Sequence, residues 1–121
     1  MWGARLVTEP VYAPEAGDLV WIDLDPRVGR EQSGRGPALV VSPIAFWQAT
    51  RFAIVCPITT RVRPFPTSAV LPDGLPIGGE ILTSHPRSID TLARALTFAG
   101  AAVPAPLLAE VRGKLAALIG L

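Results

Sequence analysis

The sequence predicts a β-rich α+β fold, in which a small β-barrel is followed by one C-terminal helix. Thirteen prolines and eleven glycines recur at short intervals, which strands and turns tolerate but long helices do not. Short apolar runs lie between them, and the hydrophobic period becomes helical only after Pro106. A chain of 121 residues suffices for one domain but not for two ordinary ones.

The first elements follow from local pattern. Residues 1–16 contain Pro10 and Pro14 and no periodicity, so we expect a flexible N-terminal lead-in before a single domain over 17–121. Residues 17–24 read as a strand that Asp25-Pro26 ends. Residues 27–36 hold three glycines and three arginines without apolar periodicity, which indicates a long, mobile, charged loop.

The middle of the chain reads as further short elements. We expect a buried strand over 37–42, a helical turn over 43–49 because proline suits the first helical position, and a third strand over 51–58. Residues 67–71 and 79–84 suggest two more strands around a Pro-Asp-Gly-Leu-Pro turn, and 87–90 is expected to continue the second of them.

The last segment has a helical period. Its apolar residues fall on one face, so a helix is expected to pack on the barrel. These residues are Leu107, Leu108, Val111, Leu115, Leu118 and Ile119.

Composition narrows the class of protein. Half of the residues are apolar and 17% are charged, which excludes disorder by composition and favours a chain that hides surface in an oligomer. Cys56 is the one cysteine, so neither an internal disulfide nor a cysteine metal site can form. We find no leader pattern and no apolar stretch near the ~20 residues of a spanning helix. The expectation is a cytoplasmic protein without a membrane partner.

Charge is divided unevenly along the chain. From Pro26 to Pro64 there are six arginines and one acid, a net charge of +5, whereas the remainder has five basic and nine acidic residues, a net charge of −4. Such a division suggests one face built for an anion. Ten of the eleven cations are arginine, whose planar fork binds phosphate and stacks on bases. A GC-rich genome that encodes arginine in place of lysine would explain the same bias.

Several ordered motifs carry a family resemblance. Gly17-Asp-Leu-Val-Trp-Ile-Asp-Leu-Asp-Pro26, Gly29-Arg-Glu-Gln-Ser-Gly34 and Pro37-Ala-Leu-Val-Val-Ser-Pro43 resemble the N-terminal signature of MazF/PemK toxins. Pro57-Ile-Thr-Thr60 and Arg87-Ser-Ile-Asp90 resemble the second and third motifs, so the likeness covers roughly residues 15 to 120.

The resemblance implies an SH3-like barrel of the CcdB/PemK type and a homodimer. It further implies a sequence-specific endoribonuclease that cleaves single-stranded RNA without a metal or other cofactor. The RNA's own 2′-hydroxyl would attack, leaving a 2′,3′-cyclic phosphate and a 5′-hydroxyl. A cognate MazE-like antitoxin would be the protein partner.

The same resemblance suggests catalytic residues. The motif acid is Glu31, and the motif hydroxyls are Thr59 and Thr60, of which Thr60 is assigned to catalysis. The family arginine before the second strand has no direct match, because Gly36 stands in its place and Arg35 comes one residue early. We expect Arg35 to fill the role, since glycine on both sides allows the loop to re-aim it.

Substrate contacts are expected from residues around these motifs. Phosphate contacts supply affinity and salt dependence more than sequence choice. His85 is the one histidine, so a paired-histidine mechanism within one protomer is excluded and a base-contacting role is preferred. The expected substrate-binding residues are Arg27, Arg30, Thr59, Arg61, Arg63, His85 and Arg87.

Two other functions are compatible with the sequence. One is a non-catalytic toxin on the same barrel, similar to CcdB, which binds DNA gyrase and would need an exposed hydrophobic C-terminal helix. The other is a plain RNA-binding module, which would keep RNA affinity without cleavage.

Overall fold

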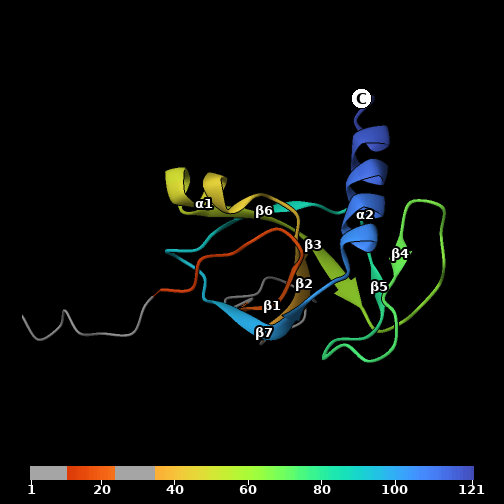
Figure 1. The fold of residues 1–121 in the computed structure, drawn as a ribbon, viewed down its shortest axis with the longest axis horizontal. Coiled ribbons are helices and arrows are strands. Elements are labelled where there is room, and N and C mark those ends of the chain that lie inside the picture. The colour runs from red at the N-terminus through yellow and green to blue at the C-terminus, as the bar shows by residue number, and fades with distance from the viewer. Residues whose placement is uncertain (1–10, 24–34) are drawn as a thin grey trace, which may run out of the picture.

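The computed structural model describes residues 11–23 and 35–121. Its elements run in the order β1 (Asp18–Asp23), β2 (Arg35–Val40), α1 (Ile44–Thr50), β3 (Phe52–Thr59), β4 (Ala69–Val70), β5 (Glu80–Ile81), β6 (Arg87–Asp90), β7 (Leu96–Ala102) and α2 (Ala105–Leu118). The expected β-rich α+β class with its C-terminal helix is confirmed (Figure 1).

The strands form one antiparallel, seven-stranded sheet. Six of them follow the order β4-β5-β3-β2-β1-β7, and β6 pairs with β3 off this path. In the described part of the chain this path of hydrogen bonds stays open, with β4 and β7 at its two ends. β3 is central, because one of its edges pairs with β2 and the other pairs first with β6 and then with β5.

Two strands differ from the sequence expectation. β6 was expected to continue the strand before it, but it pairs with Phe52–Val55 of β3 as a separate strand. The turn Leu82-Thr-Ser-His85, closed by the His85 amide donating to the Leu82 carbonyl at 3.1 Å, separates it from β5. β7 was not expected at all, because small residues hide its alternation. It is held by pairing with β1.

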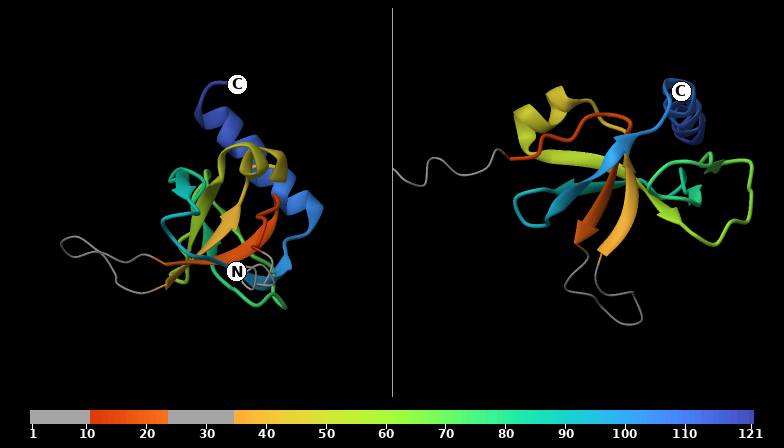
Figure 2. Two further views of the ribbon diagram at one scale, coloured as in Figure 1. Left: turned by 90° about the vertical axis from the view of Figure 1, so that its left-hand side faces the viewer. Right: turned by 60° about the horizontal axis from the view of Figure 1, so that its bottom comes forward.

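Alternation in the strands buries both faces of the sheet. One face meets α2, whose Val111 is fully buried, and the two helices lie at opposite ends of β3, as Figure 2 also shows. The core of the molecule consists of two hydrophobic clusters. The first, between the sheet and α2, includes Leu19, Leu39, Val41, Cys56, Ile58 and Ile81. The second, on the other face, comprises Val20, Ile22, Ala38, Val40, Val55 and Ile89.

The residues before β1 pack on the second cluster. Tyr12 packs against it, stacks on Phe98 of β7 with ring centroids 5.6 Å apart, and donates a hydrogen bond to the Asp18 carboxylate. Pro14 is fully buried. The expected lead-in thus has its last residues on the sheet, whereas residues 1–10 lie outside the described part.

Candidate functional site

The candidate site is a pocket of about 360 Å³ where β3 ends. Most of the residues that line it are polar, and they come from the end of β3, the following loop, β5 and the turn after β5. They are Thr59, Arg61, Arg63, Phe65, Thr67, Ser68, Glu80, Leu82, Ser84 and His85.

Thr59 stands at the strand end with its side chain half-buried in this pocket. Its hydroxyl oxygen accepts a hydrogen bond from the Arg61 amide at 3.2 Å, a local turn that hydroxyl side chains favour where a strand stops. Thr60 is exposed and is not among the pocket-lining residues described above. The two motif hydroxyls therefore differ in position, and Thr59 is the one within the pocket.

The loop after β3 supplies the positive charge. Arg61 and Arg63 are both exposed at the pocket, as is Phe65, with 67% of its surface accessible. His85 enters from the turn between β5 and β6 and is also exposed. A pocket with two guanidinium groups, an imidazole and an exposed ring suits phosphates and an unstacked base.

Beneath this loop lies a buried acid that was not among the residues expected from the sequence. Glu80 is 2% exposed and accepts hydrogen bonds from the Arg63 amide, at 2.7 Å, and from the Ser68 hydroxyl. The bond from Ser68, followed by that from Arg63, holds the pKa of Glu80 below its usual value. The one acid in the predicted strand 79–84, directly before Ile81 and Leu82, was the signal available in the sequence.

Arg35 lies away from this pocket, on β2. Its guanidinium carbon is 5.3 Å from the centre of the Trp21 ring. In the β1–β2 register Arg35 pairs with Asp23 and Gly36 pairs with Ile22. The Arg35 side chain therefore lies on one face of the sheet, and a side chain at position 36 would lie on the other.

A smaller pocket of about 180 Å³ adjoins Gly36. Its lining combines β1, β2 and β3 with one cation from β6, and consists of Ile22, Gly36, Pro37, Val55, Pro57, Ile58 and Arg87. Thus Arg87, not Arg35, shares a pocket with Gly36. Glu31, Arg27 and Arg30 lie outside the described residues.

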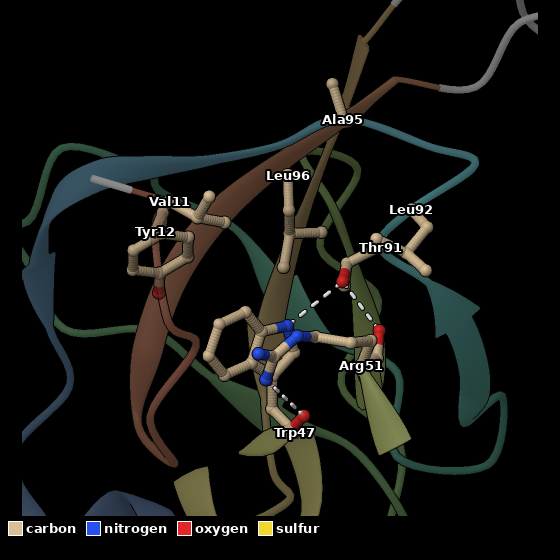
Figure 3. Close-up of a pocket in the computed structure, with 8 residues that line it drawn as sticks. All are labelled: Val11, Tyr12, Trp47, Arg51, Thr91, Leu92, Ala95 and Leu96. Atoms are coloured by element: carbon tan, nitrogen blue, oxygen red, sulfur yellow. Dashed lines mark hydrogen bonds between the residues drawn. The ribbon is translucent and has the colours of Figure 1, made fainter. Parts of the chain in front are cut away.

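A third pocket, of about 290 Å³, lies between α1, β7 and the segment before β1 (Figure 3). There the Arg51 guanidinium lies 4.1 Å from the centre of the Trp47 ring. The Trp47 indole N–H donates to the Thr91 hydroxyl oxygen at 3.0 Å, and that hydroxyl donates to the Arg51 carbonyl at 2.6 Å. These bonds fix the end of α1 against the residues after β6. We therefore assign the residues of this pocket a structural role and not a role in the candidate site.

Neither a metal-binding cluster nor a membrane-spanning helix occurs among the described residues. Within 11–23 and 35–121, no three His, Cys, Asp or Glu side chains are grouped closely enough to hold a metal ion. Neither helix of these segments has the length and hydropathy to cross a membrane.

Known proteins resemble this chain in sequence and fold. The model of a family described as "PemK-like, MazF-like toxin of type II toxin-antitoxin system" matches residues 15–119. The endoribonuclease toxin MazF of Escherichia coli K12 is 37% identical over 109 residues, which cover 90% of this chain and 96% of that protein. The endoribonuclease PemK of Escherichia coli is 36% identical over 122 residues, covering 98% and 91%.

Solved structures agree. Crystalline MazF from Deinococcus radiodurans has 44% identity and a TM-score of 0.80, covering 91% of this chain and 99% of its own. A MazE-MazF structure from the same organism has 41% identity and a TM-score of 0.80, covering 91% and 98%.

Proposed function

Because the chain belongs to the PemK-like, MazF-like toxin family of type II toxin-antitoxin systems, we propose that it is an endoribonuclease that cuts single-stranded RNA. The observation that carries the proposal is the meeting of Thr59, Arg61, Arg63 and His85 in one pocket. Thr59, Arg61 and Arg63 come from the end of β3 and the loop after it, and His85 comes from the turn after β5. The two arginines and the histidine can bind a phosphate or an unpaired base.

The proposed reaction uses the RNA as its own nucleophile and needs no metal. The 2′-oxygen loses its proton to a base and bonds to the adjacent phosphorus, and the bond from phosphorus to the 5′-oxygen breaks as that oxygen takes up a proton. The products are a 2′,3′-cyclic phosphate and a 5′-hydroxyl. Such a step calls for a base, an acid and positive charge near the phosphorane oxygens.

Roles are proposed for particular residues. Glu31 is the proposed base or orienting acid, Arg35 the charge clamp, and Thr60 with its neighbour Thr59 the hydroxyls that bind the phosphate. Support for the threonine pair comes from the Thr59 side chain in the pocket.

The remaining expected residues serve binding. Arg61 and Arg63 are proposed to follow the RNA backbone, and His85 to contact a base. Their exposure at the pocket supports this. Arg87 is proposed to hold a phosphate beside Gly36, with which it shares a pocket, and Arg27 and Arg30 are proposed to extend the same cationic path.

We propose a MazE-like antitoxin as the regulatory partner. Similar MazF chains have been solved as MazE-MazF structures. The arginines of the loop after β3 offer an anionic segment a binding surface. Both proteins would act in the cytoplasm, where the RNA is.

A homodimer is also proposed. An apolar groove of about 560 Å³ lies between α1, α2 and Pro86, and Phe46, Leu115 and Ile119 contribute to its lining. Ile119 is 71% exposed in the single chain, and a second copy that covers it would remove this apolar surface from water. Sedimentation of the wild type beside Ile119→Glu tests this: a monomeric wild type contradicts the dimer.

One observation favours the gyrase-binding alternative. Leu118, the last residue of α2, is 46% exposed, and Leu121 beyond the helix is 88% exposed. A toxin of that kind would use such an apolar C-terminal surface. A supercoiling assay with DNA gyrase tests it directly.

The deciding experiment is cleavage of a long single-stranded RNA by the purified protein in EDTA, with analysis of the 3′ ends. Thr59→Ala and Thr60→Ala are run beside the wild type. Discrete cuts that end in cyclic phosphate, and that weaken in either threonine variant, support the proposal. Intact RNA with the wild-type protein overturns the enzyme and leads to gyrase and RNA-binding assays.

A further inference from the structure

The buried carboxylate of Glu80 organises the loop that carries the cations of the pocket. It is 2% exposed, on β5. Its Oε1 accepts a hydrogen bond from the Arg63 amide at 2.7 Å, and its Oε2 accepts one from the Ser68 hydroxyl. A buried carboxylate is tolerated only where donors satisfy it, and here both donors belong to one loop.

The same loop is closed on itself by Ser68. The Phe65 amide donates to the Ser68 hydroxyl oxygen at 3.1 Å, and that hydroxyl is also 3.1 Å from the Phe65 carbonyl. Residues 60–68, which we call the cationic loop, contain Arg61, Arg63 and the exposed ring of Phe65. Glu80 therefore binds the loop at its middle and at its end.

A second anchor comes from α2. The Lys114 ammonium group donates to the Ser68 carbonyl at 2.6 Å and pairs with Glu110 at 2.9 Å. Lys114 holds only the end of the loop, however. Among the described residues, Glu80 alone accepts a hydrogen bond from the backbone amide of Arg63, so the middle of the loop depends on that carboxylate. The Arg61 amide, two residues earlier, donates to the Thr59 hydroxyl oxygen.

We propose that Glu80 is a positioning residue for RNA binding, which acts by fixing the cationic loop so that Arg61 and Arg63 face the pocket. The inference rests on the proposed function. It assigns to Glu80 no contact with RNA, because the carboxylate is buried and both of its oxygens are already engaged.

The proposal makes a prediction opposite in sign to that of simple electrostatics. Removing a negative charge beside two arginines would by charge alone tighten the binding of an anion. If Glu80 positions the loop, Glu80→Val weakens RNA binding by about tenfold, the effect of removing one charge-assisted hydrogen bond. The salt dependence also falls, by about 0.7 in the log–log slope for each phosphate of the single strand that the loop no longer binds.

Matched variants separate geometry from charge. Glu80→Gln keeps an acceptor for the Arg63 amide and offers an N–H to the Ser68 hydroxyl oxygen, so it restores most of the affinity. Asp73→Asn removes an exposed acid from the turn before β5 and controls for net charge. Arg61→Ala combined with Glu80→Val completes a double-mutant cycle, in which the Glu80 effect shrinks if it acts through Arg61.

Limited trypsin digestion reads the loop without RNA. The Arg61–Val62 bond is already exposed in the wild type, and Glu80→Val frees the loop around it, which speeds its cleavage severalfold. The thermal midpoint shows that the domain remains folded. If the wild-type protein binds no RNA but trypsin still cleaves Glu80→Val faster than the wild type, the proposed function is wrong, whereas the conclusion that Glu80 fixes the cationic loop is retained. The positioning role is overturned if Glu80→Val binds RNA as tightly as the wild type or digests at the same rate. A Glu80 effect that is fully additive with Arg61→Ala overturns it as well.

Discussion

The guanidinium group of Arg35 lies over the indole ring of Trp21, 5.3 Å from its centre. Arg35 pairs with Asp23 in the β1–β2 register, and Trp21 lies two residues before Asp23 on β1. The side chains of Arg35 and Trp21 therefore lie on the same face of the sheet. Gly36 faces the other way, toward the pocket that contains Arg87. For Arg35 to clamp a phosphate there, its side chain must leave Trp21, a contact of about 0.5–1 kcal/mol at an exposed site.

This arrangement defines a test of the clamp. If Arg35 serves the phosphorane, Arg35→Ala lowers kcat by about 10²–10³, as loss of a transition-state donor does. Arg87→Ala then acts mainly through KM, because it removes a ground-state interaction with phosphate. Single-turnover cleavage of a short RNA by both variants gives the two constants. A kcat loss confined to Arg87→Ala would transfer the clamp from Arg35 to Arg87.

A glycine beside Thr59 gives a second prediction. Gly79 has φ +128°, and a β-carbon built there would lie 2.2 Å from the Thr59 carbonyl oxygen. Gly79→Ala should therefore cost about 3 kcal/mol in unfolding free energy through strain and overlap, and it should disturb the pocket at Thr59. Gly78→Ala is the matched control, since a β-carbon there meets nothing within 4 Å. Denaturant titration of both measures the difference, and equal stabilities would contradict the clash.

Much of the fold was accessible from sequence because strong local signals mark it. The apolar run of β3 and the helical period of α2 each predict their element within a few residues. β7 was not predicted, because Ala99, Gly100 and Ala101 give no hydrophobic alternation. Its pairing with β1 is what makes it a strand. Which distant strand a segment pairs with, and in which register, is a property of the tertiary structure that a short stretch of sequence does not determine.

The candidate site was predictable in part. Arg61, Arg63 and His85 were each expected to contact substrate because they lie near the motifs, and the structure brings them together with Thr59 in one pocket. Glu80 was missed because an isolated acid in a strand has no readable role until its donors are known. The opposite directions of Arg35 and Gly36 likewise depend on a register that sequence alone does not give.

The single cysteine allows a test of core packing. Cys56 is fully buried, and burial raises the pKa of its thiol to about 11. Because the thiolate is the reactive form, alkylation of the native protein near pH 8 should be slower than that of the unfolded chain by roughly a hundredfold or more. Mass spectrometry of timed samples, with protein in denaturant as the control, measures the ratio. Equal rates would show that β3 opens freely.

The single tyrosine provides an optical test of the segment before β1. Burial, followed by the hydrogen bond and the charge of Asp18, holds the pKa of Tyr12 well above its usual value. An unfolded tyrosine ionises at about pH 10, so this stabilisation is complete below that pH and is lost as the pH rises above it. The near-ultraviolet phenolate absorbance should therefore appear only as the protein unfolds in alkali. In Asp18→Asn the charge is gone while the ring stays buried, so ionisation should begin at a lower pH than in the wild type. A folded wild-type protein that titrates near pH 10 would mean that Tyr12 is not held against Asp18 in solution.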